Sequence, residues 1–313
     1  MIVNLPVRDR ILRRRSFILP LKHVSSRDNR LPSGTMPPRE NPMIEGSSTE
    51  QTRLAFDAAA PVYDAASEHL QGIQRMRSTT SRLYLQYFPR GSRLLEINCG
   101  TGNDAITLAK HGMSILATDL SSSMLEETQK KIRAEALQLS IQTKQLSFDH
   151  LGELRGDVFD GAYSNLGGIN CADSLPSLAA DLGALVKPGG FFIATVMPPF
   201  CLWESASFLF RFQIRQAFRR QSRYGTLANL HGGEVRTYYH SPRAFRGIFA
   251  PFFDHVMTLG MAVFTPPPNF TRAYATIRSG LRLLEALDDV LAGIPPFRSI
   301  GDHYVIVLRR TAR

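Results

Sequence analysis

Short runs of apolar residues alternate along this chain with segments whose apolar positions recur with a helical period. The runs have the length of buried strands and the segments between them have the length of crossover helices, so their order predicts a parallel sheet in an α/β fold. We expect strands at residues 93–98, 114–118, 141–146, 159–164 and 191–196. We expect helices at residues 57–87, 104–110 and 121–136, the last of them capped by Ser121 or Ser122.

The second half of the chain departs from this alternation twice, and we interpret both departures as insertions into one fold. They cover approximately residues 198–240 and 264–300. A helix should begin after Ser241 at Pro242, because proline is favoured in the first turn of a helix. The remaining expected elements are a strand at 256–263, a helix near 276–291 and a final strand at 303–308.

The net charge of +10 is concentrated in two segments of the chain. Residues 1–42 hold nine Arg or Lys against three acids, and residues 211–246 hold eight Arg against Glu234 alone. The remainder is mildly acidic, which argues against a nucleic-acid groove across the whole domain. A length of 313 residues and a hydrophobic content of 43% suit one catalytic domain with insertions, which we place at residues 51–313.

Residues 1–50 combine arginines with several prolines and show no sustained hydrophobic period. We expect a disordered basic extension there, and among the candidate starts Met1, Met36 and Met43 we favour Met43. Three scattered cysteines give neither a disulfide framework nor a zinc-binding spacing, so we expect no metal. No apolar run reaches the ~20 residues of a spanning helix, and we expect a cytoplasmic protein, with contact at the membrane surface left open.

The most informative chemistry lies in residues 93–102, which read RLLEINCGTG, and in Asp119, which ends the next expected strand. Gly100 and Gly102 let the backbone turn sharply and approach a ligand without a Cβ in the way. A carboxylate at Asp119 can accept hydrogen bonds from both hydroxyls of a ribose. This strand–turn–helix–strand unit predicts a nucleoside-bearing ligand above the strand ends. Glu96 is unusual in an apolar strand, because a buried carboxylate needs hydrogen-bond partners.

These motifs resemble the class I S-adenosylmethionine (SAM)-dependent methyltransferases, especially small-molecule members such as the ubiquinone and menaquinone C-methyltransferases. The acid four positions before Gly100, the adjacent Cys99 and the Leu-Ser-Ser-Ser-Met after Asp119 favour this family over nicotinamide dehydrogenases. Three flanking segments resemble the family in the expected order, namely FDAAAPVYD at 56–64, FDGAYSNLG at 159–167 and VKPGGF at 186–191. The resemblance implies a seven-stranded Rossmann-like sheet, mostly parallel with an antiparallel last strand, with helices on both faces and a helical lid insertion.

The resemblance also assigns cofactor-binding positions to this chain. Backbone groups of residues 99–102 would hold the methionine end of SAM, Asp119 would hold the ribose, and Leu120 with Met124 would enclose the adenine. Tyr63 would close the pocket. The full set implied by the resemblance is Tyr63, Glu96, Asn98, Cys99, Gly100, Gly102, Asp119, Leu120, Met124, Ser147, Phe148, Asn165, Leu166 and Gly167.

The segment after the fourth expected strand bears on the identity of the methyl acceptor. Methyltransferases that act on DNA bases or on glutamine carry an Asn/Asp-Pro-Pro-aromatic loop there, whereas this chain has Asn165 followed by Leu-Gly-Gly. We therefore expect a small, lipophilic acceptor that is methylated on oxygen or carbon, or on an aliphatic amine, in preference to a base or an amide. The alternatives are an RNA methyltransferase that uses the Arg-rich insertion and a SAM-binding protein that transfers no methyl group.

Residues 201–224 show a helical pattern with one apolar face and a second face that carries arginines four residues apart. These arginines are Arg211, Arg215, Arg219 and Arg223. We interpret the segment either as a lid helix over the core or as an interfacial helix that meets anionic lipid or a lipophilic substrate. A hydroxyl acceptor would also need a base. The candidate bases, each expected at an element end on the acceptor side, are Glu204, His240, Asp302 and His303.

Overall fold

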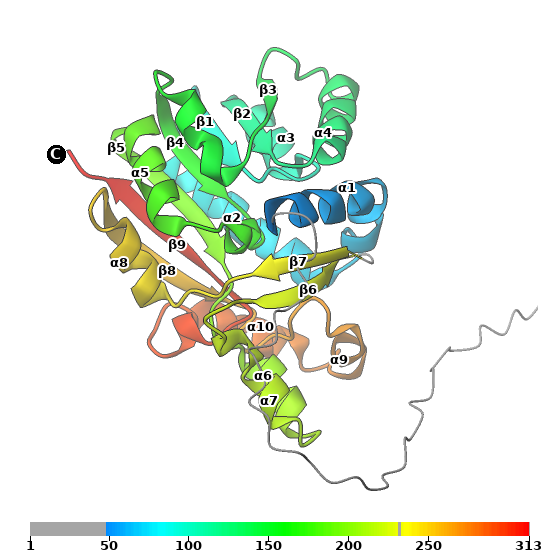
Figure 1. Ribbon diagram of the computed structural model, residues 1–313. Helices are drawn as coiled ribbons and strands as arrows, with labels where there is room; N and C mark the ends of the chain where they lie inside the picture. The colour runs from blue at the N-terminus through cyan, green and yellow to red at the C-terminus, as the bar shows by residue number, and fades with distance from the viewer. Residues whose placement is uncertain (1–47, 231–232, 313) are drawn as a thin grey trace, which may run out of the picture. The chain divides into compact units, whose positions relative to one another are not determined.

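The computed structural model describes residues 48–230 and 233–312, and a seven-stranded sheet forms its centre (Figure 1). The strands are β1 (Arg93–Ile97), β2 (Ser114–Asp119), β3 (Ile141–Gln145), β4 (Phe159–Ser164), β5 (Val186–Val196), β8 (Phe253–Met261) and β9 (His303–Arg310). Their order in the sheet is β3-β2-β1-β4-β5-β9-β8. β9 runs antiparallel to both of its neighbours, whereas the pairs among β1 to β5 are parallel. The predicted fold class is confirmed.

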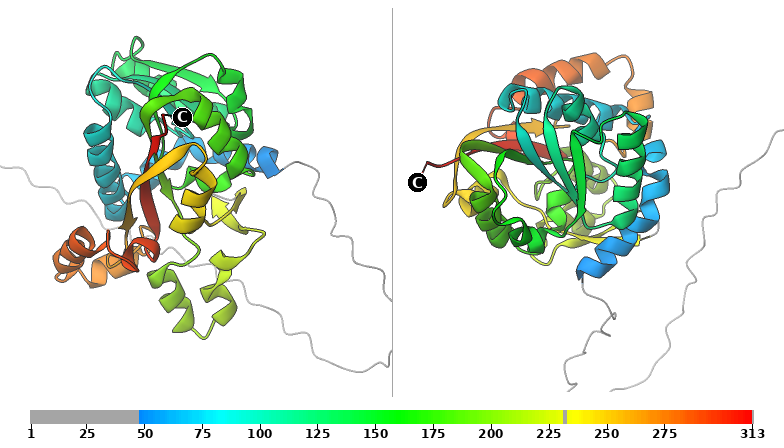
Figure 2. Two further views of the ribbon diagram at one scale, coloured as in Figure 1. Left: turned by 90° about the vertical axis from the view of Figure 1, so that its left-hand side faces the viewer. Right: turned by 90° about the horizontal axis from the view of Figure 1, so that it is seen from above.

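Helices cover both faces of this sheet (Figure 2). One face carries α2 (Gln71–Tyr87), α3 (Asn103–Lys110) and α4 (Ser122–Ala134), and the other carries α5 (Leu175–Leu185) and α8 (Pro242–Phe249). Alternate side chains of a strand serve the two layers. In β5, for example, Phe192 and Ala194 belong to the apolar cluster of α5 and α8, whereas Ile193 belongs to that of α2 and α3. Strands buried on both faces account for the continuous apolar runs in the sequence.

A cluster of four buried phenylalanines joins α8 to the sheet. The rings of Phe245 and Phe249 stack with their centroids 4.5 Å apart, and Phe249 stacks on Phe192 of β5 at 5.4 Å. Phe253, the first residue of β8, lies 6.1 Å from the ring of Phe249. Phe249 is therefore the shared member of three ring contacts. The helix begins at Pro242, as its sequence predicts.

The single helix expected over residues 57–87 is in fact two, α1 (Ser48–Ser67) and α2, separated at residues 68–70. No glycine or proline marks this break in the sequence. The break is imposed by packing, because α2 lies on the sheet while α1 packs against α4 and a hairpin strand, β7 (Gly233–Thr237). Of the expected extension at residues 1–50, the first 47 residues lie outside the described part of the chain, and the last three begin α1.

The first insertion is not the continuous helix expected over residues 201–224. It contains α6 (Leu202–Leu209), α7 (Ile214–Ala217) and the 3₁₀ turn η3 (Arg219–Gln221). A two-stranded antiparallel hairpin of β6 (Thr226–Leu230) and β7 follows, which the sequence did not predict. In Figure 1, α6 and α7 extend below the sheet, whereas the hairpin lies beside α1.

Two interactions fold the chain back after α6. Oγ of Ser205 donates to the carbonyl of Ala217 at 2.8 Å, and Nε of Arg219 donates to Glu204 at 2.7 Å. The backbone reverses at Phe212, which has a φ of 57°. The predicted row of four exposed arginines is therefore wrong, because Arg219 is engaged with an acid.

The second insertion contains α9 (Thr271–Thr276) and α10 (Leu281–Leu291) in place of one helix over 276–291. Asp288 of α10 is buried and accepts hydrogen bonds from the backbone N–H groups of residues 263–265. These bonds attach α10 to the end of β8. Among the described residues, no helix combines the length and the apolar character needed to cross a membrane.

Replacing Phe249 by alanine should lower the free energy of unfolding by about 3–5 kcal/mol, because the change removes three ring contacts and leaves a cavity. Phe210→Ala is the matched control, since Phe210 is 85% exposed and its removal should change stability by less than about 0.5 kcal/mol. Urea denaturation measures both values. Equal midpoints for the two variants would contradict the assignment of Phe249 to the core.

Candidate functional site

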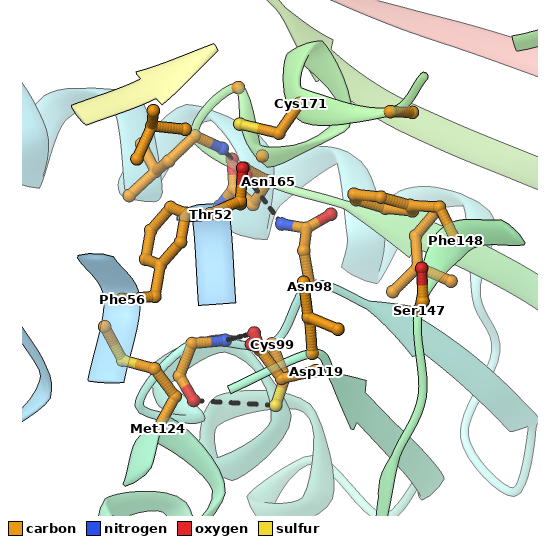
Figure 3. A pocket seen from close by; sticks show the side chains of 18 of the residues that line it. Thr52, Phe56, Asn98, Cys99, Asp119, Met124, Ser147, Phe148, Asn165 and Cys171 are labelled. Atoms are coloured by element: carbon orange, nitrogen blue, oxygen red, sulfur yellow. Dashed lines mark hydrogen bonds between the residues drawn. The ribbon is translucent and has the colours of Figure 1, made fainter. Parts of the chain in front are cut away.

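A cavity of about 250 Å³ lies at the carboxyl ends of β1, β2 and β4, the edge at which open α/β sheets bind ligands. The loops that follow these strands and β3 form one side of it. Two segments far apart in the sequence cover it, since α1 supplies Phe56 and Tyr63 and the β6–β7 hairpin supplies Leu230 and Val235. Figure 3 shows Phe56 on one side of the cavity and Phe148, from the loop after β3, on the other.

The turn after β1 depends on two glycines with positive φ, and they serve different purposes. Gly100 has a φ of 55°, lines the cavity, and donates its N–H to Oδ2 of Asp119 at 2.8 Å. Gly102 has a φ of 75°, and a Cβ built on it would lie only 2.5 Å from Cγ2 of Thr128. Gly102 is not among the residues that line the cavity. Its small size lets the start of α3 approach α4.

Backbone donors position both carboxylate oxygens of Asp119. Oδ2 accepts from Gly100, and Oδ1 accepts from the N–H of Ser121 at 2.9 Å. Each oxygen keeps a further lone pair, and the carboxylate lines the cavity. Burial disfavours the charged form and raises the pKa of Asp119 to about 6, although the two backbone bonds lower the pKa in part. The carboxylate can therefore accept two more hydrogen bonds from a ligand.

The two acids of the segment FDAAAPVYD attach α1 to this turn. Asp57 accepts from Oγ of Ser121, at the start of α4, with a distance of 2.5 Å. Asp64 accepts from Oγ1 of Thr101 at 2.7 Å and pairs with Nζ of Lys131 at 2.5 Å. Burial raises the pKa of Asp64, but these partners outweigh burial and lower it overall. The segment FDAAAPVYD thus covers the cavity. The carboxylate of Asp57 attaches it to the start of α4, and that of Asp64 attaches it to the glycine turn.

Glu96 does not reach the cavity, although the resemblance places it among the cofactor contacts. Its side chain is buried in β1, and Oε2 has no hydrogen-bond partner among the described residues. Burial, with the nearby charge of Asp104, raises the pKa of Glu96 well above its ordinary range.

A buried polar network occupies the end of β4. Asn165 donates from Nδ2 to Asp104 at 2.9 Å and to Thr80 at 3.0 Å, and its Oδ1 accepts from Thr195 at 2.9 Å. The side-chain amide of Asn165 is thus engaged within the protein. Arg77 of α2 pairs with Asp104 at 3.0 Å and also lines the cavity. Sequence analysis missed Arg77, because a single arginine in a helix belongs to no motif.

The cavity lining includes all of the residues predicted to bind the cofactor except Glu96 and Gly102. These residues are Tyr63, Asn98, Cys99, Gly100, Asp119, Leu120, Met124, Ser147, Phe148, Asn165, Leu166 and Gly167. Sequence analysis missed the contributions of Phe56, Arg77 and the β6–β7 hairpin. Phe56 is the first residue of the segment FDAAAPVYD, so its position in this motif could have indicated that it contacts the cavity.

Residues 94–190 match the family model described as a methyltransferase domain. The matched region begins in β1 and ends in β5, so it includes the glycine turn, Asp119 and the loop after β4. This chain contains a methyltransferase domain. The family resemblance predicted from the motifs is confirmed.

Known proteins resemble parts of this chain. A segment of 105 residues is 31% identical to the S-adenosyl-L-methionine-dependent Diels-Alderase iccD of Talaromyces variabilis and covers 33% of this chain and 36% of that protein. A segment of 162 residues is 28% identical to demethylmenaquinone methyltransferase of Symbiobacterium thermophilum and covers 50% and 63%. The crystal structure of the [4+2]-cyclase SpnF has a TM-score of 0.57 at 13% identity, over 86% of this chain and 98% of that one. The chain thus spans less than two thirds of the length of both sequence relatives.

Three of the four candidate bases meet in one network, outside the region that matches the family model. Arg220, which sequence analysis did not single out, donates to Oε2 of Glu204 at 2.7 Å and to Oδ1 of Asp302 at 2.8 Å. Oδ2 of Asp302 lies 3.0 Å from Nδ1 of His303. The fourth candidate, His240, lies outside the network. Burial lowers the pKa of His240, and its Nε2 has no partner among residues 48–230 and 233–312.

Binding of S-adenosylhomocysteine should weaken as the pH falls below about 6, because protonation of Asp119 removes the acceptor for the ribose hydroxyls. The loss should approach tenfold per pH unit, and the affinity should level off above the pKa. Asp119→Asn should weaken binding at neutral pH by about 2–3 kcal/mol, the contribution of charge-assisted bonds, and should remove this pH dependence. Calorimetry across this pH range measures both effects. A wild-type affinity that stays constant through pH 6 would contradict the role of Asp119.

Proposed function

We propose that this protein transfers a methyl group from SAM to a small, lipophilic acceptor, on oxygen or carbon. The observation that carries the proposal is the carboxylate of Asp119. Two backbone N–H groups hold it in a cavity at the carboxyl edge of a methyltransferase sheet. The name of the demethylmenaquinone methyltransferase supports an acceptor of this kind.

The cavity lining fits the parts of SAM. Asp119 would accept hydrogen bonds from the ribose, and Leu120, Met124 and Phe148 offer apolar surface to the adenine. Arg77 would pair with the carboxylate of the methionine end. When bound, SAM supplies an electrophilic methyl group. The chain itself contributes alignment, because holding the two reactants together supplies much of the rate enhancement in a displacement reaction.

The rest of the lining supports a lipophilic acceptor. Met197 and Ala172 approach the cavity from the sheet side, and Leu230 and Val235 approach it from the hairpin. Because α1 and the hairpin lie over the cavity, a bound acceptor would be largely withdrawn from water. The engaged amide of Asn165 supports transfer to oxygen or carbon, because it leaves no free carbonyl to hold a planar amine.

A surface segment at residues 209–224 supports collection of the acceptor from an anionic membrane. Phe210 and Phe212 are 85% and 93% exposed, and no acid lies between residues 205 and 233. Exposed aromatic rings combined with cations are the features by which peripheral proteins enter the headgroup region. The exposed cations of the segment are Arg211, Arg215 and Arg223.

A second candidate function is a cyclisation that requires bound SAM but transfers no methyl group. The relative from Talaromyces variabilis is named a SAM-dependent Diels-Alderase, and its 105 matched residues are 31% identical to this chain. A mostly apolar cavity would suit a folded hydrocarbon substrate as well as a methyl acceptor. The two functions differ in whether SAM is consumed.

Incubation of the protein with SAM and a panel of phenols, quinols and isoprenoid acceptors should yield S-adenosylhomocysteine and a product heavier by one methyl group. Mass spectrometry detects both products. Asp119→Ala should abolish them together with SAM binding. Asp157→Ala should change neither product formation nor SAM binding, because Asp157 pairs with Arg93 at the amino end of β1, away from the cavity.

The alternatives give different results in the same assay. Conversion of a substrate while SAM stays intact would favour the cyclase function over methyl transfer. Tight binding of NADH without binding of SAM would contradict both functions.

Replacing Arg211, Arg215 and Arg223 by glutamine should weaken binding to phosphatidylserine vesicles by about 3 kcal/mol, since each cation near such a surface contributes about 1 kcal/mol. SAM affinity should not change. The matched control replaces three arginines that are exposed elsewhere, namely Arg82, Arg90 and Arg155. Vesicle sedimentation at low salt, where screening is weakest, is the measurement. Absence of wild-type binding there would contradict membrane contact, and tight binding to single-stranded RNA would favour the RNA methyltransferase.

A further inference from the structure

We propose that His303 is a general base that accepts the proton of a hydroxyl acceptor, and that Asp302 and Arg220 are positioning residues for its ring. The inference rests on the proposed methyl transfer and deepens it. It restricts the acceptor to molecules with an ionisable O–H group, such as phenols and enols.

The sheet topology brings His303 to the ligand-binding edge. Because β9 runs antiparallel to β5, its first residues lie beside the carboxyl end of β5, where Tyr304 pairs with Val196. A Cβ built on Gly167 would lie 3.0 Å from Nε2 of His303 and 3.1 Å from Cε of Met197. Gly167 and Met197 both line the cavity. The imidazole therefore lies at the margin of the cavity, directly behind Gly167 and Met197, and is not itself among the lining residues. It occupies space that exists because residue 167 has no side chain.

The hydrogen bonds of His303 leave the correct nitrogen available. Nδ1 lies 3.0 Å from Oδ2 of Asp302, and a carboxylate can only accept, so the neutral ring carries its proton on Nδ1. Among residues 48–230 and 233–312, the hydrogen bond to Asp302 is the one that the ring of His303 makes, and it leaves Nε2 unused. Its lone pair is therefore free at the end that faces Gly167. A carboxylate behind Nδ1 also stabilises the imidazolium that forms when Nε2 takes up a proton.

Asp302 is itself held in place from the opposite side. Nη2 of Arg220 donates to Oδ1 of Asp302 at 2.8 Å, and Nη1 donates to the Asp302 carbonyl at 3.1 Å. Glu204 accepts from the same guanidinium at 2.7 and 3.0 Å and balances its charge. Burial raises the pKa of Asp302, but the charges of His303 and Arg220 outweigh burial and hold the pKa well below its ordinary range. The carboxylate thus stays ionised across the pH range in which a histidine titrates.

Cys201 and Tyr239 lie next to the hydrogen-bonded residues Arg220, Asp302 and His303. Burial raises the pKa of the Cys201 thiol to about 12, so this group stays neutral beside Asp302. The ring of Tyr239 lies 5.2 Å from Cζ of Arg220. His240 hydrogen-bonds through its backbone to Met197 and has no acid behind its ring, so it lacks the orientation that Asp302 gives to His303.

An ion pair between Arg220 and Glu204 would be sufficient to fix η3 on α6. A purely structural role of this kind would require neither Asp302 nor a histidine beside the cavity. The second oxygen of Asp302 serves the imidazole, and the missing side chain at Gly167 gives the imidazole its space. These two features distinguish a proton-accepting arrangement from a structural one.

The reaction step is simple and balanced. The O–H bond of the acceptor breaks, its proton moves to Nε2, and its electron pair stays on the oxygen that forms the new bond to the methyl group. The bond between this methyl group and the SAM sulfur breaks, with its electron pair remaining on sulfur. The imidazolium returns its proton to water when the product leaves.

Nitrogen-15 NMR of the histidine rings tests the proposal without turnover. In the protein bound to S-adenosylhomocysteine, the neutral ring of His303 should show a protonated Nδ1 and an unprotonated Nε2. The spectrum of His303→Gln identifies the signal. Asp302→Asn should disturb this tautomer preference, because an amide can donate to Nδ1 as well as accept from it. A neutral His303 ring with the proton on Nε2 would overturn the proposal, because such a ring cannot accept a proton at the cavity rim.

Kinetics provide the second test. His303→Gln should reduce kcat for a phenolic acceptor by roughly 10²–10⁴-fold, the range for general bases, with unchanged affinity for S-adenosylhomocysteine. The matched control is His255→Gln, which alters a histidine near the start of β8 that bonds to Thr258.

The outcomes separate this inference from the proposed function. A wild type that forms S-adenosylhomocysteine and a His303→Gln variant with equal kcat would overturn the role of His303 alone. A wild type that methylates no acceptor would overturn the proposed function and the inference with it. If His303→Gln has a lower melting temperature, its loss of activity can reflect unfolding. The NMR measurement on the wild type then decides the proposal.

Discussion

The buried carboxylate of Asp119 is the interaction on which the ligand-binding end of this domain depends. A carboxylate withdrawn from water is stable only where donors replace the water, and here the donors are the N–H groups of Gly100 and Ser121. The first requires a backbone turn with positive φ directly after β1, and the second requires α4 to begin directly after β2. One charged group therefore fixes the relative positions of two strand ends and a helix start, which together form one side of the cavity.

The same constraint extends to the cover of the cavity. Oγ of Ser121 donates to Asp57 of α1, so the residue that serves Asp119 through its backbone also holds the covering helix through its side chain. Asp64, two helical turns further along α1, accepts a hydrogen bond from Thr101 of the glycine turn. The apolar cluster between α1 and its neighbours is small, and its fully buried members are Ala59, Ala60 and Met124. Charged hydrogen bonds thus contribute much of the specificity with which α1 is placed.

The sequence predicts the parts of the fold that local pattern determines. Strands such as β1 and β9 were predicted because they are buried on both faces and read as apolar runs, and Asp119 and Gly100 were predicted because their spacing forms a motif. The helix over residues 201–224 was wrong because its arginines were taken as one exposed row, whereas Arg219 and Arg220 pair with Glu204. Such pairing is a tertiary property. The β6–β7 hairpin and the break at residues 68–70 were missed for the same reason, since contacts with distant segments determine both.

The antiparallel β9 gives this sheet a property that a wholly parallel one lacks. A parallel strand places only its carboxyl end, and the loop that follows it, at the end of the sheet where the ligand binds. Because β9 enters at that edge, its first residue, His303, lies next to the loops after β4 and β5. Arg220 and Glu204 of the first insertion then meet Asp302, the residue before β9, in one network. Cofactor and acceptor chemistry can therefore arise from opposite ends of the sequence, because strand direction determines which residues share an edge.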